Sequence, residues 1–263
     1  GFVSRGLGDV YKRQGLMRTN IPSFRLPESV LDEEVYRIVK MGAELKTNSY
    51  IDDLEPLINK YDSIFIGTGA PKGKDLNLPG RKEASENIHI GIDWLTSIAF
   101  EHTKEIGKRV LVIGGGNTAM DCCRSAVRLG AKDVKVTVRS PFSRMKASDW
   151  EIEEAMEEGI PILDNTSPKE FLLDENGKLT GMKFDKMVEK DIDGVSKLVP
   201  SGEEVVYECD DVLLAIGQDN AFPWIRKDIG IEFGEWDMPV VDKTTMQSSH
   251  PKVFFGGDAA WGP

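Results

Sequence analysis

The residues best suited to chemistry in this sequence form a glycine-rich segment, VLVIGGGNTAMD, at residues 110–121. An apolar run is followed by a G-x-G-x-x-A pattern at Gly114, Gly116 and Ala119, and then by helical periodicity. In such a turn the first glycine permits tight reversal, the second lets a pyrophosphate approach the backbone, and the alanine lets the helix pack closely. N–H groups at the helix start then face the anion. This strand-and-helix context favours a dinucleotide site over a glycine turn without a ligand.

An arginine stands where the following strand is expected to end. Sites for NAD usually carry an acidic residue there, about 20 residues after the glycines, which binds the ribose 2′-hydroxyl. This sequence has Arg139 instead, with Ser140, Arg144 and Lys146 close behind. A guanidinium forms charge-assisted hydrogen bonds with a 2′-phosphate. The sequence therefore favours NADPH over NADH, and an ordinary solvated arginine is the alternative.

Three further glycines follow apolar runs of strand type. Gly69 comes after Thr68 at the end of the run 63–66, and Gly257 precedes Asp258 at the end of the run 253–255. An aspartate at a strand end can accept a hydrogen bond from a ribityl hydroxyl. Taken alone, these are more typical of plain turns, and Asp258 of a helix cap. Gly217 ends the run 212–216 in the same way.

Composition excludes several other classes of protein. The 263 residues are 40% hydrophobic, and 33 Lys and Arg stand against 44 Asp and Glu, a net charge of −11. Such a balance disfavours nucleic acid and anionic membranes as partners. The cysteines, Cys122, Cys123 and Cys209, lack Cys-x-x-Cys spacing, and with three histidines they suggest neither a redox disulfide nor a metal site. No apolar run approaches the ~20 residues of a membrane span, so a cytoplasmic protein is expected.

The order of expected elements predicts an α/β fold with parallel sheets. Helices are predicted at 29–41, with Ser29 as N-cap and Gly42 as terminator, and at 53–60, 92–104, 117–129 and 149–158, the last capped by Ser148 with Glu151. Strands of the α/β pattern are predicted at 44–47, 63–66, 109–113, 134–138, 212–216 and 253–255. After the helix at 149–158 the pattern changes to short strands at 161–163, 171–173, 179–184 and 205–207, with a hairpin turn at Asn176-Gly177.

From about residue 15 to residue 263 the chain resembles a family of NADPH-dependent, FAD-containing oxidoreductases. The family is typified by the small (beta) subunit of glutamate synthase, and the same module occurs in dihydropyrimidine dehydrogenase. Five segments carry the resemblance, in the family's order: IPSFRLP (21–27), YDSIFIGTGA (61–70), VLVIGGGNTAMD (110–121), DVLLAIGQ (211–218) and VFFGGDAAWGP (253–263).

The resemblance implies a doubly wound, Rossmann-like NADPH domain inserted into an FAD-binding Rossmann-like domain. The expected boundaries are a non-native leader at 1–14, FAD-domain segments at 15–86 and 219–263, and the NADPH domain at 87–218. The family's first strand with its own G-x-G-x-x-G, the Cys-rich iron–sulfur region before it and the last helix have no counterpart here, so an internal fragment is expected. The family also commonly has two consecutive arginines where this chain has Arg139-Ser140.

The resemblance further implies that hydride passes from NADPH to FAD and that electrons leave through iron–sulfur clusters on another domain or subunit. The cofactors carry this chemistry, so no catalytic side chain is expected. Two alternatives remain: an NADPH-binding fragment without a working flavin, and a flavin-free dehydrogenase, which would need an acid or base that no histidine obviously supplies. The final electron acceptor is set outside this chain.

The candidate cofactor-binding residues fall into three groups. Those expected at NADPH are Gly114, Gly115, Gly116, Asn117, Thr118, Ala119, Arg139, Ser140 and Arg144. Those expected at FAD are Thr68, Gly69, Gly257 and Asp258. Gly217 is a candidate for which neither cofactor is specified.

Overall fold

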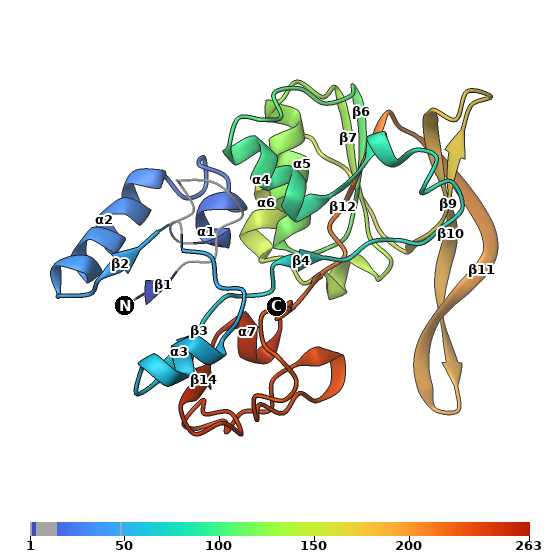
Figure 1. The fold of residues 1–263 in the computed structure, drawn as a ribbon. Helices are drawn as coiled ribbons and strands as arrows, with labels where there is room; N and C mark the ends of the chain where they lie inside the picture. The colour runs from blue at the N-terminus through green and yellow to red at the C-terminus, as the bar shows by residue number, and fades with distance from the viewer. Residues whose placement is uncertain (1, 4–14, 48) are drawn as a thin grey trace. The chain divides into compact units, whose positions relative to one another are not determined.

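The computed structural model describes residues 2–3, 15–47 and 49–263 (Figure 1). The chain divides into two compact units: residues 73–217 form one, and residues 1–72 with 218–263 form the other. The chain passes between them at β4 (Lys72–Gly73) and β13 (Gln218–Asp219). The expected non-native leader lies outside the described residues, except that Phe2–Val3 form strand β1, which pairs in parallel with β2 (Leu45–Lys46).

A parallel sheet forms the centre of the unit at residues 73–217. Its five strands stand in the order β5-β12-β6-β7-β8. Their bounds are β5 (Ile88–Ile90), β6 (Arg109–Ile113), β7 (Asp133–Thr137), β8 (Ile162–Leu163) and β12 (Asp211–Leu214). Successive side chains of a strand point to opposite faces, and both faces of β6 are buried, which explains its uninterrupted apolar sequence. The predicted α/β class with a parallel sheet is confirmed.

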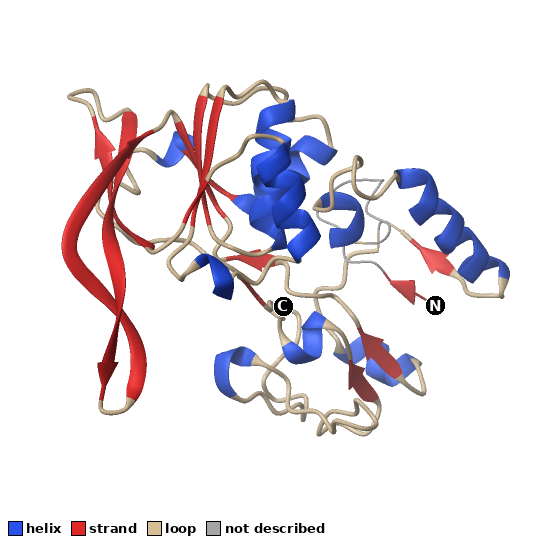
Figure 2. Ribbon diagram, turned by 180° about the vertical axis from the view of Figure 1, so that it is seen from behind, coloured by secondary structure: helices blue, strands red, loops and turns tan. Residues whose placement is uncertain are grey.

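Helices cover one face of this sheet and a second sheet covers the other (Figure 2). Val110 and Val112 of β6 pack with Met120 in the core beneath the helices, which are α4 (Gly91–Ala99), α5 (Asn117–Arg128) and α6 (Asp149–Glu157). Leu111 packs with Phe184 on the opposite side. There the antiparallel strands β9 (Thr166–Leu173), β10 (Leu179–Ile192) and β11 (Val195–Glu208) replace the helices that a doubly wound sheet would have.

The antiparallel sheet is longer than the sequence predicted. β9 pairs with β10 only as far as Lys186, whereas β10 and β11 continue pairing to Ile192 and Val195. Residues 187–200 therefore form a two-stranded arm beyond β9, visible in Figure 2. Asp193 and Gly194 close it with φ of 58° and 78°, the positive values that a tight hairpin turn needs. The predicted turn at Asn176-Gly177 is confirmed, with Gly177 at φ 79°.

The unit formed by the two ends of the chain has its own core. β3 (Ile64–Ile66) and β14 (Val253–Phe255) pair in parallel, and Leu54, Trp224 and Phe255 are buried around them. The helices are α1 (Leu16–Thr19), α2 (Glu28–Lys40), α3 (Glu55–Lys60) and α7 (Asp258–Trp261). A short 3-10 turn, η3 (Glu235–Asp237), belongs to this unit, whereas η1 (Ser85–Asn87) and η2 (Phe142–Arg144) belong to the unit at residues 73–217.

Several predicted helix boundaries were wrong. Ser29 lies inside α2, whose N-cap is Pro27. The helix expected at 92–104 ends at Ala99, because the Ser97 carbonyl accepts hydrogen bonds from His102 and Thr103 and Glu101 has φ of 58°. Ser148 is the N-cap of α6, but the expected side-chain capping bond with Glu151 is not formed. In the described part of the chain, no helix is long and apolar enough to cross a membrane.

Candidate cofactor-binding sites

The glycine turn joins β6 to α5, and its first glycine is required by a close contact. Gly114 has φ of 140°, and a Cβ there would lie 2.1 Å from the carbonyl oxygen of Ala215. Its N–H donates to the Thr137 carbonyl at 3.0 Å, so the turn is fixed against β7 as well. The sequence predicted a tight turn at Gly114. The structure adds that the segment following β12 leaves no room for a side chain.

The second glycine of the run holds the loop that follows β7. A Cβ on Gly115 would lie 2.9 Å from Cγ1 of Val138 and 3.5 Å from Cγ of Met145. The Gly115 carbonyl accepts hydrogen bonds from the N–H groups of Lys146 and Ala147, both at 3.0 Å. The loop carrying Arg139 and Arg144 is therefore packed on the glycine turn at both of its ends.

Gly116 differs from both of its neighbours. Its φ of −103° is available to any residue, and a Cβ there would meet nothing within 4 Å. Neither backbone conformation nor packing among the described residues requires glycine here. The open space lies at the start of the 12-residue helix α5, whose first N–H groups lack partners within the helix. An anionic group that approaches the backbone fits this position. Ala119, fully buried, packs α5 onto the sheet.

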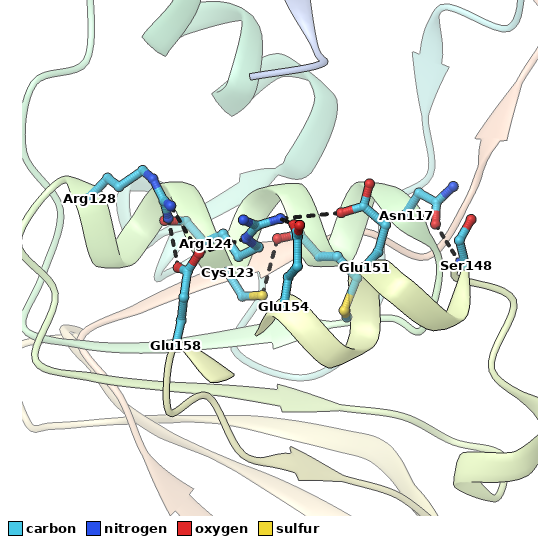
Figure 3. A network of polar contacts seen from close by, with 9 residues as sticks. Asn117, Cys123, Arg124, Arg128, Ser148, Glu151, Glu154 and Glu158 are labelled. Atoms are coloured by element: carbon cyan, nitrogen blue, oxygen red, sulfur yellow. Dashed lines mark hydrogen bonds and ion pairs between the residues drawn. The ribbon is translucent and has the colours of Figure 1, made fainter. Parts of the chain in front are cut away.

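Asn117 and Thr118 open α5, and the side chain of Asn117 has a structural partner. Its Oδ1 accepts a hydrogen bond from the Ser148 N–H at 2.8 Å (Figure 3). This bond ties the first residue of α5 to the N-cap of α6. The resemblance implied that Asn117 contacts NADPH. The structure leaves its backbone N–H and its side-chain Nδ2 for that role, because its side-chain oxygen joins the two helix starts.

The two arginines after β7 have different surroundings. Arg139 is exposed, and within the described chain its guanidinium has no salt-bridge partner. Arg144, in η2, forms an ion pair with Glu189 of β10, with 2.5 Å between Nη2 and Oε1. The Ser140 carbonyl accepts a hydrogen bond from the Asn165 N–H at 3.4 Å. Arg139 is thus free to bind an anion, whereas Arg144 already has a carboxylate.

The candidates in the other unit meet at one edge of a sheet. Because β3 and β14 run in parallel, Thr68-Gly69 and Gly257-Asp258 follow the same ends of adjacent strands. The Oγ1 atom of Thr68 is buried without a hydrogen-bond partner among the described residues. Gly257 has φ of 61°, and a Cβ there would meet nothing within 4 Å. Asp258 is exposed. A ligand with donor groups fits this edge, since it would satisfy Thr68.

Two further residues complete this description. Asn220, which sequence reasoning missed, donates from Nδ2 to the Ala259 carbonyl at 3.4 Å, while its Oδ1 is buried without a partner among the described residues. A lone asparagine after an apolar strand gives no sequence signal that its side chain is buried with an unpartnered oxygen. Gly217 has φ of 111°, and its carbonyl accepts a hydrogen bond from Lys74 N–H at 3.0 Å. That bond joins the two ends of residues 73–217.

Comparison with known proteins identifies the family of this chain. A model of the family described as pyridine nucleotide-disulphide oxidoreductase matches residues 25–263, a range that contains the glycine turn after β6 and the candidate residues after β3 and β14. The chain belongs to the pyridine nucleotide-disulphide oxidoreductase family. Proteins of this family use FAD and NAD(P)H. The family model therefore covers every candidate residue.

Curated relatives refine the resemblance. The chain is 32% identical over 276 residues to the NADPH-Fe(3+) oxidoreductase subunit beta of Geobacter sulfurreducens (strain DL-1 / KN400), covering 95% of this chain and 41% of that protein. It is 31% identical over 269 residues to the glutamate synthase [NADPH] small chain of Escherichia coli (strain K12), covering 94% and 56%. The resemblance to the glutamate synthase small-subunit group is confirmed. The chain spans about half the length of these relatives.

A solved structure supports the fold of this pyridine nucleotide-disulphide oxidoreductase. FprA of Mycobacterium tuberculosis in complex with NADPH superposes with a TM-score of 0.75 at 15% identity, covering 95% of this chain and 70% of that protein. At this identity the similarity concerns the fold alone.

Despite the family's name, the cysteines of this chain are poorly placed for thiol chemistry. Cys122, Cys123 and Cys209 are all buried and free. Burial raises the pKa of Cys122 well above its usual value, and raises the pKa of Cys123 and of Cys209 to about 12. The Cys123 thiol donates to the Met120 carbonyl. Within the described residues, no cluster of three or more His, Cys, Asp or Glu could hold a metal ion.

A buried ionic network fixes α5 against α6 (Figure 3). Arg124 of α5 is almost fully buried and pairs with Glu151 and Glu154 of α6 and with Glu158, the C-cap of that helix. Arg128 adds a second, more exposed bond to Glu158 at 2.7 Å. Hydrogen bonds from Arg128, followed by those from Arg124, hold the pKa of the Glu158 carboxyl below its usual value. The network sets the position of α6, and so of the Ser148 N–H that Asn117 binds.

Proposed function

We propose that this chain forms the NADPH- and FAD-binding part of a flavin oxidoreductase of the glutamate synthase small-subunit type. The observation that carries the proposal is Gly116. Among the described residues it has open space where a side chain would lie, and an ordinary backbone conformation. A pyrophosphate bound at the start of α5 accounts for a glycine that the fold itself does not need.

NADPH would lie along the C-terminal ends of β6 and β7. Its pyrophosphate would bind backbone N–H groups at Gly116, Asn117 and Thr118. Arg139, exposed and without a salt-bridge partner in the described chain, would bind the 2′-phosphate with charge-assisted hydrogen bonds. NADPH appears in the names of both curated relatives above, which supports this choice of dinucleotide.

FAD would lie at the edge formed by β3 and β14. The hydroxyl of Thr68 has no partner among the described residues and is available to it, and Gly257 leaves room for its approach. Asp258 would accept a hydrogen bond from a ribityl hydroxyl. When both cofactors are bound, they supply the redox chemistry, hydride transfer from nicotinamide C4 to flavin N5. This chain's residues bind and orient them, and no side chain is assigned as acid, base or nucleophile.

We further propose that electrons pass on to iron–sulfur centres in another domain or subunit. One feature supports this: the relatives are named as a subunit and a small chain of larger enzymes.

Substitution of the first and third glycines of the turn, Gly114 and Gly116, tests the proposal. Gly116→Val should lower the midpoint of thermal unfolding only modestly, since a Cβ there meets nothing, although glycine is the better N-cap of α5. It should weaken NADPH binding at least tenfold, about 1.4 kcal/mol, by blocking the anion. Gly114→Ala is the contrast. It should destabilise the fold, because its Cβ would lie 2.1 Å from the Ala215 oxygen. Unchanged NADPH affinity in a folded Gly116→Val protein would refute the assignment of this turn.

A further inference from the structure

Glu189 is an acidic residue of the β10–β11 arm that reaches the proposed phosphate site. Its Oε1 lies 2.5 Å from Nη2 of Arg144. Its Oε2 accepts a hydrogen bond from the Ser196 hydroxyl at 3.1 Å, across the arm. Ser196 of β11 thus fixes one carboxylate oxygen of Glu189, while the other oxygen faces Arg144. Both side chains are partly exposed, 52% for Arg144 and 41% for Glu189, so the pair is accessible to a ligand.

The base of the arm is attached to the loop that carries the arginines. The Met187 N–H donates to the Asn165 carbonyl at 2.8 Å, and the Asn165 N–H donates to the Ser140 carbonyl at 3.4 Å. The loop in turn packs on Gly115 through Val138 and Met145, the residues next to Arg139 and Arg144. These contacts place a negative charge beside the cationic loop at the glycine turn.

A second carboxylate near this loop has a different role. Oδ2 of Asp164 accepts hydrogen bonds from the Phe142 N–H at 2.8 Å and from Asn165 Nδ2 at 3.1 Å. Asp164 therefore shapes the backbone before η2. Glu189, in contrast, pairs directly with a guanidinium.

We propose that Glu189 is a specificity-determining residue that opposes binding of the 2′-phosphate of NADPH by holding Arg144. The inference rests on the function proposed above. A 2′-phosphate at Arg139 must compete with Glu189 for Arg144, and this competition reduces its affinity. NADH carries no 2′-phosphate, so Glu189 leaves NADH affinity unchanged. Glu189 therefore reduces the ratio by which the protein prefers NADPH over NADH.

Charge removal at Glu189 tests the inference in the full chain. Glu189→Gln keeps the shape of the side chain and removes its charge. We expect it to tighten NADPH binding roughly 1.5- to 5-fold, the range that partly exposed ion pairs reach, and to leave NADH affinity unchanged. The gain should shrink at high salt, because exposed charges are screened. It should also shrink in an Arg144→Ala background.

Glu204→Gln is the matched control. Glu204 lies on β11, pairs with Lys169 and is 44% exposed. Its substitution removes the same charge from the same sheet and should change neither affinity. Unchanged or weaker NADPH binding in Glu189→Gln overturns the inference, and so does a gain that persists undiminished without Arg144. If one of these outcomes occurs while the wild-type protein binds NADPH with an Arg139-dependent preference, this inference alone fails. If it does not bind NADPH, the proposed function fails as well.

Discussion

At the scale of single residues, the proposed preference for NADPH depends on Arg139. Replacing Arg139 by Ala removes one charge-assisted contact with the 2′-phosphate, a contact commonly worth about 1.5–3 kcal/mol. NADPH affinity should fall roughly 10- to 150-fold, while NADH affinity should stay nearly constant. Titration calorimetry with both dinucleotides measures the two values.

Arg37→Ala is a suitable control for Arg139→Ala. Arg37 is an exposed arginine of α2 that pairs with Glu33 and Glu34, and it belongs to neither candidate site. Its loss should affect neither dinucleotide. Equal losses of NADPH and NADH in Arg139→Ala would show that Arg139 does not recognise the 2′-phosphate.

The buried thiols predict that the protein loses stability in alkali. Burial raises the pKa of Cys123 and of Cys209 from 9.0 to about 12. A group whose pKa is raised by folding contributes its full stability below the unfolded pKa. That contribution is lost as pH rises through the folded pKa. The free energy of unfolding, from urea titrations, should therefore fall between about pH 9 and pH 12.

Alanine variants isolate the thiol contribution to this alkaline loss, since lysines and tyrosines titrate in the same range. Cys123→Ala and Cys209→Ala should each flatten the slope of unfolding free energy against pH above pH 9. The same slope in wild type and both variants would mean that the thiols ionise as easily in the folded protein as in the unfolded one.

Residue chemistry was predictable where it is local. The spacing of Gly114, Gly116 and Ala119 identified the turn, because each position serves one step of a strand-to-helix reversal. The ion pair of Arg144 with Glu189 joins residues far apart in sequence, and only the folded arm brings them together. The partner of Arg144 therefore could not be deduced from the motif.

At the scale of elements, the Arg124 network holds α6 on α5. Arg124→Met keeps most of the side-chain volume but leaves Glu151, which is fully buried, without its arginine. Breaking a buried pair in this way commonly costs about 3–5 kcal/mol. We expect a loss of that order in the free energy of unfolding, measured by urea denaturation.

Arg128→Met provides the comparison on the same helix. Arg128 is 41% exposed and shares Glu158 with Arg124. Exposed pairs contribute up to about 1 kcal/mol, so its loss should be small. Similar losses for the two variants would show that burial does not set the strength of this network.

Elements were predicted best where a short apolar run ends at a glycine. The strands at Arg109–Ile113 and Val253–Phe255 have the predicted bounds, because Gly114 and Gly256 mark where each apolar run stops. The arm of β10 and β11 was missed. Its strands are largely exposed and polar, so they lack an alternating apolar pattern, and pairing with each other defines them.

At the scale of the whole molecule, the unit with the glycine turn begins earlier than the family pattern suggested. Residues 73–86, expected in the first domain, belong to the unit at 73–217. Leu76 and Leu78 pack against its core, and Ala84 is buried within it. The Phe171 N–H donates to the Pro79 carbonyl at 3.0 Å. This segment has no helix or strand pattern to reveal its attachment, so tertiary contacts alone define the boundary.

The unit at 73–217 should therefore fold and bind NADPH without the rest of the chain. It is continuous in sequence, has cores on both faces of its sheet, and has its ends joined by the bond from Lys74 to Gly217. A polypeptide of residues 73–217 should unfold cooperatively and bind NADPH within about twofold of the full chain, since the glycine turn, Arg139 and the arm all lie within it. A polypeptide of residues 87–217 loses the packing of Leu76, Leu78 and Ala84 and should be less stable by at least about 2 kcal/mol. Equal stability of the two in urea would place the boundary near residue 87 after all.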